Sequence, residues 1–193
     1  MADLRELEAR ERALVSYALL SMDAFTFTRS KQSCEIAQEA GLTCDNGIAV
    51  DEYATTSDPD IFAAGDCTSH PAFAGGRVRL ESVQNAIDQA KHAALAMLGK
   101  ATAYFEVPWF WSDQYDLKLQ IAGLARPTDL TVLRGTPENR KFSVFHLRDG
   151  VVAAVEAVNA APDYIIGRKL IAARAIIAPE RLADLSVPVK SLA

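Results

Sequence analysis

The chain has 193 residues, half of them hydrophobic, and a formal net charge of −5 at pH 7. This length suffices for one good-sized hydrophobic core or for two small ones, so we expect one or two domains. The 20 Lys and Arg residues are scattered along the chain, and no basic stripe is available to neutralise the phosphates of a nucleic acid. We therefore expect no nucleic-acid partner.

The sequence does not favour a membrane protein. Its apolar runs, such as "AALAML", are far shorter than the roughly 20 residues that cross a bilayer. The first residues, "MADLRELEARERAL", are charged where a signal peptide needs an apolar core. Three cysteines are an odd number, which favours free or buried thiols over a disulfide framework. We expect a cytoplasmic protein without a membrane partner.

Histidines and cysteines do not predict a metal site. The three histidines lie far apart in the sequence, and no CxxC or CxxxxC pair occurs. Metal-binding motifs place their ligands at short, characteristic spacings, which this chain lacks. The absence of a neighbouring cysteine pair also argues against a flavoenzyme that relays electrons through a disulfide.

In chain order, the first expected element is a surface helix over residues 3–20, where apolar residues recur at roughly helical spacing between Arg and Glu. Asn46-Gly47 then predicts a turn. A short strand with Ile48 and Val50 on one face follows this turn. These elements leave the first part of the chain with mixed helical and extended character.

The stretch "TSDPDIFAAGDCTSH" predicts a short apolar strand over residues 61–64 that ends at Gly65-Asp66. An aspartate at the mouth of a buried strand either holds a ligand or caps a turn. From these residues alone, capping is the better supported of the two interpretations of Asp66.

Residues 83–98 carry the clearest helical pattern in the chain, and Gly99 supplies a C-terminal stop. The apolar stripe of this helix consists of Val83, Ala86, Ile87, Ala90, Ala94, Met97 and Leu98. Its first turn follows Glu81 and Ser82.

After Pro108-Trp109 the apolar period changes from helical spacing to two, which predicts an antiparallel sheet. The alternating positions are Leu117, Leu119 and Ile121, then Leu130 and Val132, then Phe142 and Val144. Asp149-Gly150 predicts a tight hairpin to the strand "VVAAVEAV". A helix is expected to open at Pro162. We expect this helix to turn Ile165, Ile166, Leu170 and Ala173 inward, and Arg168, Lys169 and Arg174 outward.

Three segments, "TSDPDIFAAGD", "ESVQNAIDQAK" and "PWFWSDQYDLKLQIAGL", occur in an order and spacing that resemble the C-terminal part of the flavin-dependent ferredoxin reductases. The resemblance is to the type that includes putidaredoxin reductase, rhodocoxin reductase and the reductases of aromatic-ring dioxygenases. It covers about residues 35–193, and residues 1 to about 33 do not share it.

The resemblance implies a flavin site. The residue that matches Asp66 accepts hydrogen bonds from the ribityl hydroxyls of FAD, since ligands collect outside the carboxyl ends of α/β strands. Two-electron reduction places negative charge on the N1–C2=O edge of the flavin, which a helix N-terminus stabilises. The resemblance therefore implies that the backbone N–H groups near Val83 and Gln84 meet this edge, while Glu81 or Ser82 caps or orients the helix. The alternative for Glu81 is an ordinary acidic start of an amphipathic helix.

Trp109 and Trp111 have two possible roles. Two tryptophans within three residues more often serve core or hairpin packing than a cofactor wall. The resemblance points to Trp111 as the tryptophan beside the isoalloxazine ring and near the surface where ferredoxin docks. It leaves Trp109 as a core residue.

The chain departs from the family pattern, because its ten glycines never form the GxGxxG motif that binds a dinucleotide. The sequence therefore looks like a C-terminal fragment or gene remnant of a FAD-dependent NAD(P)H:ferredoxin oxidoreductase. We expect no site for NADH or for the adenine of FAD, and we expect the isolated chain not to retain FAD. The alternative function is a non-catalytic fold or self-association module without flavin. We assign no catalytic residue and no metal.

The predicted fold class is α+β. An antiparallel sheet with helices over residues 104–193 follows a remnant of an α/β FAD-binding domain over residues 34–103. Residues 1–33 are unassigned and expected to be helical. The strand edge at residues 61–64 and the apolar stripe of the helix at 83–98 both need a neighbour to cover them. The cover is either the helix over residues 3–20 of the same chain or a second copy of the chain. We predict the second, a homodimer.

Overall fold

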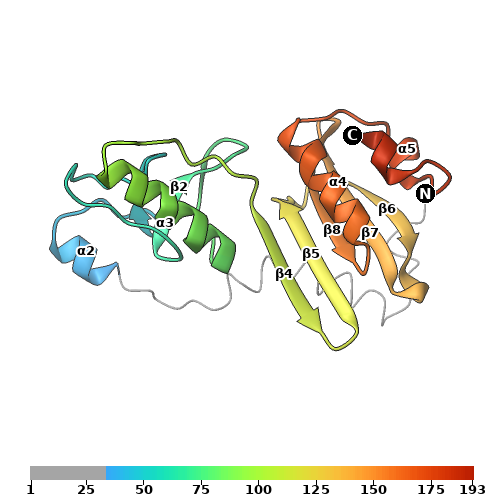
Figure 1. Ribbon diagram of the computed structural model, residues 1–193, viewed down its shortest axis with the longest axis horizontal. Helices are drawn as coiled ribbons and strands as arrows, with labels where there is room; N and C mark the ends of the chain where they lie inside the picture. The colour runs from blue at the N-terminus through green and yellow to red at the C-terminus, as the bar shows by residue number, and fades with distance from the viewer. Residues whose placement is uncertain (1–33) are drawn as a thin grey trace. The chain divides into compact units, whose positions relative to one another are not determined.

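The computed structural model describes residues 34–193, which form two compact units over residues 34–106 and 107–193 (Figure 1). The helix predicted for residues 3–20 lies outside the described residues.

The first unit contains a small mixed sheet and two helices. The elements are α2 (Glu35–Glu39), β1 (Ile48–Ala49), β2 (Thr68–Pro71), β3 (Arg77–Val78) and α3 (Val83–Met97). Strand β2 lies in the middle, parallel to β1 and antiparallel to β3.

The predicted turn at Asn46-Gly47 is confirmed and leads directly into β1. Asn46 has φ 52° and Gly47 has φ 135°. A Cβ atom on Gly47 would lie 2.9 Å from the carbonyl oxygen of Cys67, so only glycine permits this close approach of two backbones.

The strand predicted for residues 61–64 is wrong. Only Phe62 in this segment forms a bridge, an isolated one with Thr55. Its backbone bonds to the preceding loop instead, with Ala63 N donating to Ala54 O at 3.0 Å. The regular strand begins later, at Thr68, so that Asp66 precedes a strand rather than following one.

Helix α3 confirms the predicted helix and its stop signal. Gly99 has φ 70°, its N–H donates to Ala96 O at 2.9 Å, and the N–H of Lys100 donates to Leu95 O at 2.8 Å. This pair of bonds is a Schellman motif, which satisfies the last carbonyl groups of the helix.

The buried side of α3 is largely polar, while much of its apolar stripe is exposed. The buried residues are Asn85, Gln89 and Ala93. The exposed large apolar residues of the stripe are Val83 (62%), Ile87 (45%), Met97 (61%) and Leu98 (71%). Gln89 explains this orientation, because its Oε1 accepts hydrogen bonds from Gly65 N at 2.7 Å and Thr68 Oγ1 at 2.9 Å.

The second unit contains the predicted antiparallel sheet. Its strands are β4 (Trp109–Gln114), β5 (Leu117–Gly123), β6 (Leu130–Thr136), β7 (Lys141–Arg148) and β8 (Val151–Val158). They follow the order β4-β5-β8-β7-β6, and every neighbouring pair is antiparallel. Asp149 (φ 53°) and Gly150 (φ 81°) form the predicted hairpin between β7 and β8.

One face of this sheet carries a buried apolar cluster of Leu119, Ile121, Phe142, Val144 and Val158. Helix α4 (Ala161–Ala172) packs on the opposite face, where Gly167 lies so close to Val155 that a Cβ atom would be 2.4 Å from its side chain. The short helices α5 (Pro179–Ala183) and η3 (Val189–Leu192) complete the chain. A short 3₁₀ helix, η2 (Pro137–Asn139), links β6 and β7.

The predicted orientation of α4 is correct in part. Ile166 and Leu170 are buried, but Ile165 is 54% exposed and Ala173 is also exposed. Tyr164 and Ile171 occupy the inward positions instead, because the contact of Gly167 with Val155 fixes the rotation of the helix. The predicted α+β class with an antiparallel sheet is confirmed.

Candidate functional site

Asp66 lies in a tight turn that packs against the start of α3. Thr68 donates to Gly65 O from its N–H at 3.0 Å and from its hydroxyl at 2.9 Å. A Cβ atom on Gly65 would lie 3.4 Å from Cβ of Ala86. The turn therefore holds Asp66 beside the first turn of α3, although its place ahead of β2 differs from the prediction.

Arg79 connects Asp66 with Glu81. Its Nε donates to the backbone oxygen of Asp66 at 2.8 Å, and its Nη2 donates to Oε1 of Glu81 at 2.8 Å. Both side chains of the ion pair are largely buried, with 16% and 19% exposure. Arg79 contacts only the backbone oxygen of Asp66. Among residues 34–193, the Asp66 carboxylate has no hydrogen-bond partner.

Ser82 caps α3. Its hydroxyl oxygen accepts a hydrogen bond from Asn85 N at 3.2 Å, and its carbonyl oxygen accepts one from Ala86 N. Of the two candidates for the cap, Ser82 fills the role, while Glu81 lies outside the helix and pairs with Arg79.

The backbone N–H groups of Val83 and Gln84 point out of the N-terminus of α3. Helix geometry leaves the first N–H groups without an intrahelical acceptor, and these two donors have no protein partner in the described part of the chain. They carry the positive end of the helix dipole, which favours an anion or a partial negative charge.

The side chain of Gln84 points along the helix rather than toward its N-terminus. Its Nε2 donates to Oδ2 of Asp88 at 2.6 Å, and Lys91 pairs with Asp88 at 3.0 Å. Burial alone would raise the pKa of Asp88, but the hydrogen bonds from Gln84 and Lys91 outweigh it and hold the pKa below its ordinary value. Gln84 therefore offers a ligand its backbone, not its amide.

Two further residues, Asn85 and Tyr104, support this end of α3 and were not predicted. The Tyr104 hydroxyl donates to Oδ1 of Asn85 at 2.9 Å, and Nδ2 of Asn85 donates to Leu80 O at 3.1 Å. Burial raises the pKa of Tyr104 well above its ordinary value, so the phenol keeps its donor proton. No sequence pattern links residues so far apart.

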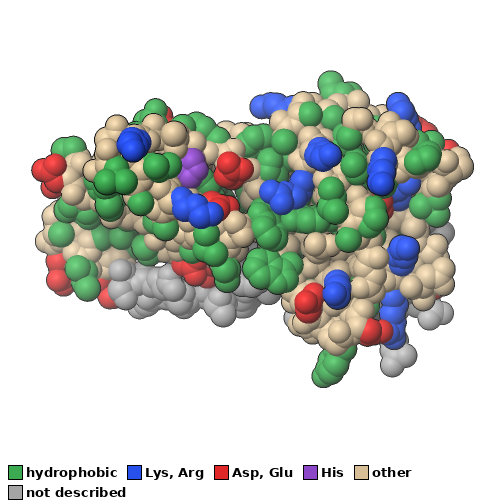
Figure 2. Space-filling model, in the orientation of Figure 1, with side chains coloured by type: hydrophobic (Ala, Val, Ile, Leu, Met, Phe, Trp, Pro, Cys, Tyr) green, Lys and Arg blue, Asp and Glu red, His purple; other side chains and the backbone are tan. Residues whose placement is uncertain are grey.

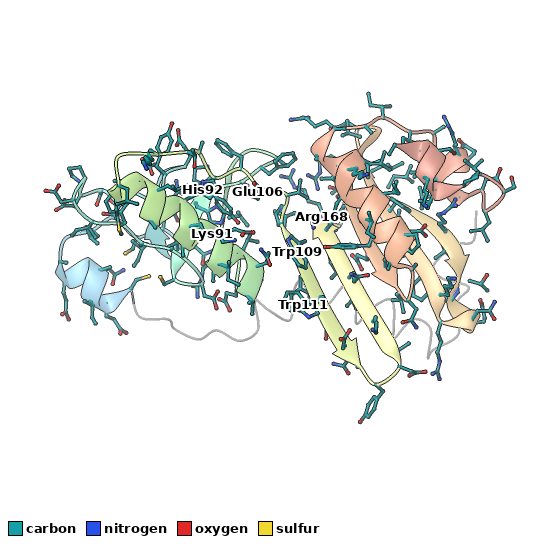
Figure 3. The ribbon with its side chains drawn as sticks, viewed as in Figure 1. Lys91, His92, Glu106, Trp109, Trp111 and Arg168 are labelled. Atoms are coloured by element: carbon teal, nitrogen blue, oxygen red, sulfur yellow. The ribbon has the colours of Figure 1, made fainter. Side chains whose placement is uncertain are left out.

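Trp111 lies in the second unit, on the edge strand β4, with 42% of its surface exposed. Its ring centroid is 5.4 Å from that of Trp109, and the guanidinium of Arg168 lies 5.1 Å from the centroid of Trp109 (Figure 3). Trp109 is half-buried under this cation, so its prediction as a core residue is wrong. Arg168 was not predicted as part of this cluster.

The first unit thus assembles five of the six predicted site residues. Asp66, Glu81, Ser82, Val83 and Gln84 surround the N-terminus of α3. Their chemistry fits the middle of a flavin nucleotide, since a free carboxylate can accept from ribityl hydroxyls and two free N–H groups can donate to a flavin oxygen or nitrogen. The sixth residue, Trp111, belongs to the second unit.

Two kinds of site do not occur in the described residues. No group of three or more His, Cys, Asp and Glu within residues 34–193 could hold a metal ion. Within the same range, every helix is too short or too polar to span a bilayer.

Two family models match the chain. The model described as "Reductase C-terminal" matches residues 109–193, and the model described as "Pyridine nucleotide-disulphide oxidoreductase" matches residues 26–90.

Curated relatives of the chain are ferredoxin reductases. The ferredoxin reductase subunit of 5,5'-dehydrodivanillate O-demethylase from Sphingobium sp. is 50% identical over 155 residues, which are 79% of this chain and 38% of that protein. Rhodocoxin reductase from Rhodococcus erythropolis is 45% identical over 157 residues, which are 81% of this chain and 37% of that protein. The chain therefore spans less than two fifths of the length of these relatives.

Solved structures of ferredoxin reductases have the same fold over most of this chain. The ferredoxin reductase of the CYP199A2 system from Rhodopseudomonas palustris gives a TM-score of 0.78 at 45% identity, covering 82% of this chain and 40% of that one. The reductase–putidaredoxin covalent complex gives a TM-score of 0.78 at 41% identity, covering 82% of this chain and 38% of the solved chain. The chain thus belongs to the family of the FAD-dependent ferredoxin reductases, of which it carries the C-terminal part.

Proposed function

We propose that the chain supplies the flavin-edge part of a FAD-dependent NAD(P)H:ferredoxin oxidoreductase. The observation that carries this proposal is the N-terminus of α3, where the free N–H groups of Val83 and Gln84 lie on the helix turn against which the Asp66 turn packs. Arg79 ties Asp66 to Glu81 at this place.

Each residue has one task in this proposal. The Asp66 carboxylate accepts hydrogen bonds from the ribityl hydroxyls, and the N–H groups of Val83 and Gln84 donate to the N1–C2=O edge of the ring. Ser82 fixes the helix start, and Glu81 holds Arg79 so that the charge of this cation is neutralised. Bound FAD would take electrons from a nicotinamide cofactor and pass them to an iron–sulfur ferredoxin.

The second unit would contribute the ferredoxin-facing surface. Trp111 is exposed on an edge strand, and the cation of Arg168 lies over the neighbouring Trp109. A flat aromatic surface beside a fixed positive charge suits a partner with acidic residues around its cluster. One solved relative is a covalent complex of putidaredoxin reductase with putidaredoxin, which supports a ferredoxin as the partner.

Titration of the chain with FAD, followed by flavin fluorescence, tests the flavin site. We expect weak, reversible binding that Asp66→Asn weakens about tenfold or more, because a hydrogen bond to a charged acceptor contributes roughly 1.5–3 kcal/mol. Asp60→Asn is the matched control, since Asp60 is exposed and lies in the loop before the Asp66 turn. Equal affinities of all three proteins would contradict the assignment of Asp66.

A second candidate function is self-association without flavin, as a homodimer. It is supported by the apolar stripe of α3, of which Val83, Ile87, Met97 and Leu98 are exposed. Hydrophobic side chains also reach the surface elsewhere on both units (Figure 2), but a contiguous helical stripe is a better template for association.

Light scattering tests the second candidate. A homodimer through α3 predicts twice the chain mass for the wild type and the chain mass for Ile87→Glu. Ile36→Glu is the control, because Ile36 is exposed on α2 and lies outside the stripe. A monomeric wild type would remove this candidate.

We also propose that the protein resides in the cytoplasm. The free thiols of Cys34, Cys44 and Cys67 support this location, because thiols persist where glutathione and thioredoxin keep cysteines reduced.

A further inference from the structure

Two of the three cysteines lie on either side of Ile48 in the first unit. Cys44 forms an isolated antiparallel bridge with Ile48. The N–H of Ile48 donates to the carbonyl oxygen of Cys67 at 2.8 Å. Residues that are 23 positions apart in the sequence are thus held next to one β-strand residue, so the backbone places their thiols in one region.

Helix α2 brings the third cysteine to the same place. Cys34 is its N-cap, and the carbonyl oxygen of Cys34 accepts from Gln38 N at 2.7 Å. The chain then reverses at Gly41, which has φ 80°, and Leu42 N donates to Ala37 O at 2.9 Å. This reversal returns the chain along the helix toward its N-terminus, which brings Cys44 to the end of α2 where Cys34 lies.

Cys67 is the least available of the three thiols. Its Sγ donates to the carbonyl oxygen of Ala64 at 3.6 Å, which turns the S–H toward the backbone. Burial also raises the pKa of Cys67 above its ordinary value. A thiol that remains protonated and bonded reacts slowly in exchange reactions.

We propose that Cys34 and Cys44 form a site of reversible oxidative modification, in which a small disulfide such as glutathione disulfide converts the two thiols into an intrachain disulfide. One protein thiolate attacks a glutathione sulfur, and the first glutathione thiolate leaves. The second protein thiolate then attacks the sulfur of its neighbour in the mixed disulfide and releases the second glutathione. Two protein thiols are oxidised, one glutathione disulfide is reduced to two glutathiones, and no other reagent is needed.

The bond would join the start of α2 to the residue that precedes the turn into β1. Both thiols are half-buried rather than enclosed, so a tripeptide can reach them. Burial and the neighbouring Cys34 thiol raise the pKa of Cys44, and the thiolate fraction of such a group grows about tenfold per pH unit below its pKa. The reaction is therefore expected to be slow at neutral pH and faster in mild alkali.

The test is incubation of the native chain with glutathione disulfide at pH 7.5 and pH 8.5, followed by alkylation and non-reducing peptide mapping by mass spectrometry. We expect a Cys34–Cys44 linked peptide two hydrogen masses lighter than the sum of its parts. We expect it to form about tenfold faster at the higher pH and to disappear on reduction. Cys67 should remain open to alkylation in unfolded samples.

Three variants sharpen the result. Cys67→Ser is the matched control and should form the same linked peptide at the same rate. Cys34→Ser and Cys44→Ser should each stop at a mixed disulfide with glutathione. A link through Cys67, a disulfide between two chains, a wild-type mixed disulfide that never resolves, or no reaction would each overturn the proposal.

Discussion

Asn85 makes three hydrogen bonds at the start of α3, where the site residues meet. Its backbone N–H donates to Ser82 Oγ, its Nδ2 donates to Leu80 O, and its Oδ1 accepts from the Tyr104 hydroxyl. Only 4% of the residue is exposed. A buried amide with all these partners fixes one orientation of the helix start.

Tyr104→Phe is expected to destabilise the first unit. The change keeps the ring but leaves the buried Oδ1 of Asn85 without a partner, which costs roughly 1–3 kcal/mol of unfolding free energy. Hydrogen exchange of the amides of α3 measures the effect directly, because both tryptophans lie in the other unit. Tyr115→Phe is the control, since Tyr115 is fully exposed. Equal exchange in the two variants would mean that the Tyr104 bond is not formed in solution.

We predict that the unfolding free energy of the first unit depends on pH through His70. Burial is the main cause that lowers the pKa of His70 below 6.5, so the folded state holds the ring neutral. The unfolded chain then binds a proton that the folded chain rejects, and this contribution to stability is present above pH 6.5 and lost as the pH falls below it. We expect the unfolding free energy of the wild type to fall more between pH 7.5 and pH 5.5 than that of His70→Gln. An identical fall in both proteins would contradict a neutral His70.

Among the elements, helix α4 allows a test by mutation of which of its faces packs on the sheet. Leu170 is 2% exposed and faces the sheet, while Lys169 beside it is exposed. Leu170→Ala should cost about 2–5 kcal/mol of unfolding free energy, and Lys169→Ala should change little. Denaturant unfolding followed by tryptophan fluorescence reports on this unit, which contains both tryptophans. Comparable losses would mean that the helix is turned the other way.

The sheet of the second unit could be predicted because its information is local. Hairpins join β4 to β5 and β7 to β8, so alternation and an Asp-Gly turn specify neighbours directly. Residues 61–64 show where this reasoning fails. They have the composition of a strand, but the loop at Ala54 supplies the nearest hydrogen-bond partner, and composition does not reveal which partner is nearest.

The residues around the candidate site could be predicted to a similar extent. The Ser82 cap follows from a local pattern before an apolar run. Asp66 was predicted as a flavin ligand because the segment "TSDPDIFAAGD" resembles the ferredoxin reductases. Arg79, Asn85 and Tyr104 could not be found, because each acts on a residue that is distant in sequence or through a backbone atom. Gln89 was also missed, since a buried glutamine on a polar helix face has no sequence signature.

In the whole molecule, each of the two units has a different part in the proposed function. The first unit presents a helix N-terminus with a free carboxylate beside it, and the second presents an exposed tryptophan on an edge strand. Relatives in this family are longer chains, of which this sequence spans 37–39% in several cases. The flavin contact in the first unit matters most, since the proposed transfer of electrons to a ferredoxin depends on it.

The most direct test of this claim is a titration of the ¹⁵N-labelled chain with FAD, followed by amide chemical shifts. We expect the amides of Val83 and Gln84 to shift most, because they would donate to the flavin edge, and the amide of Asp66 to shift with them. Asp66→Asn should reduce these shifts at equal FAD concentration. Shifts confined to other segments, or no shift at the N-terminus of α3 at millimolar FAD, would rule out a flavin site at this helix.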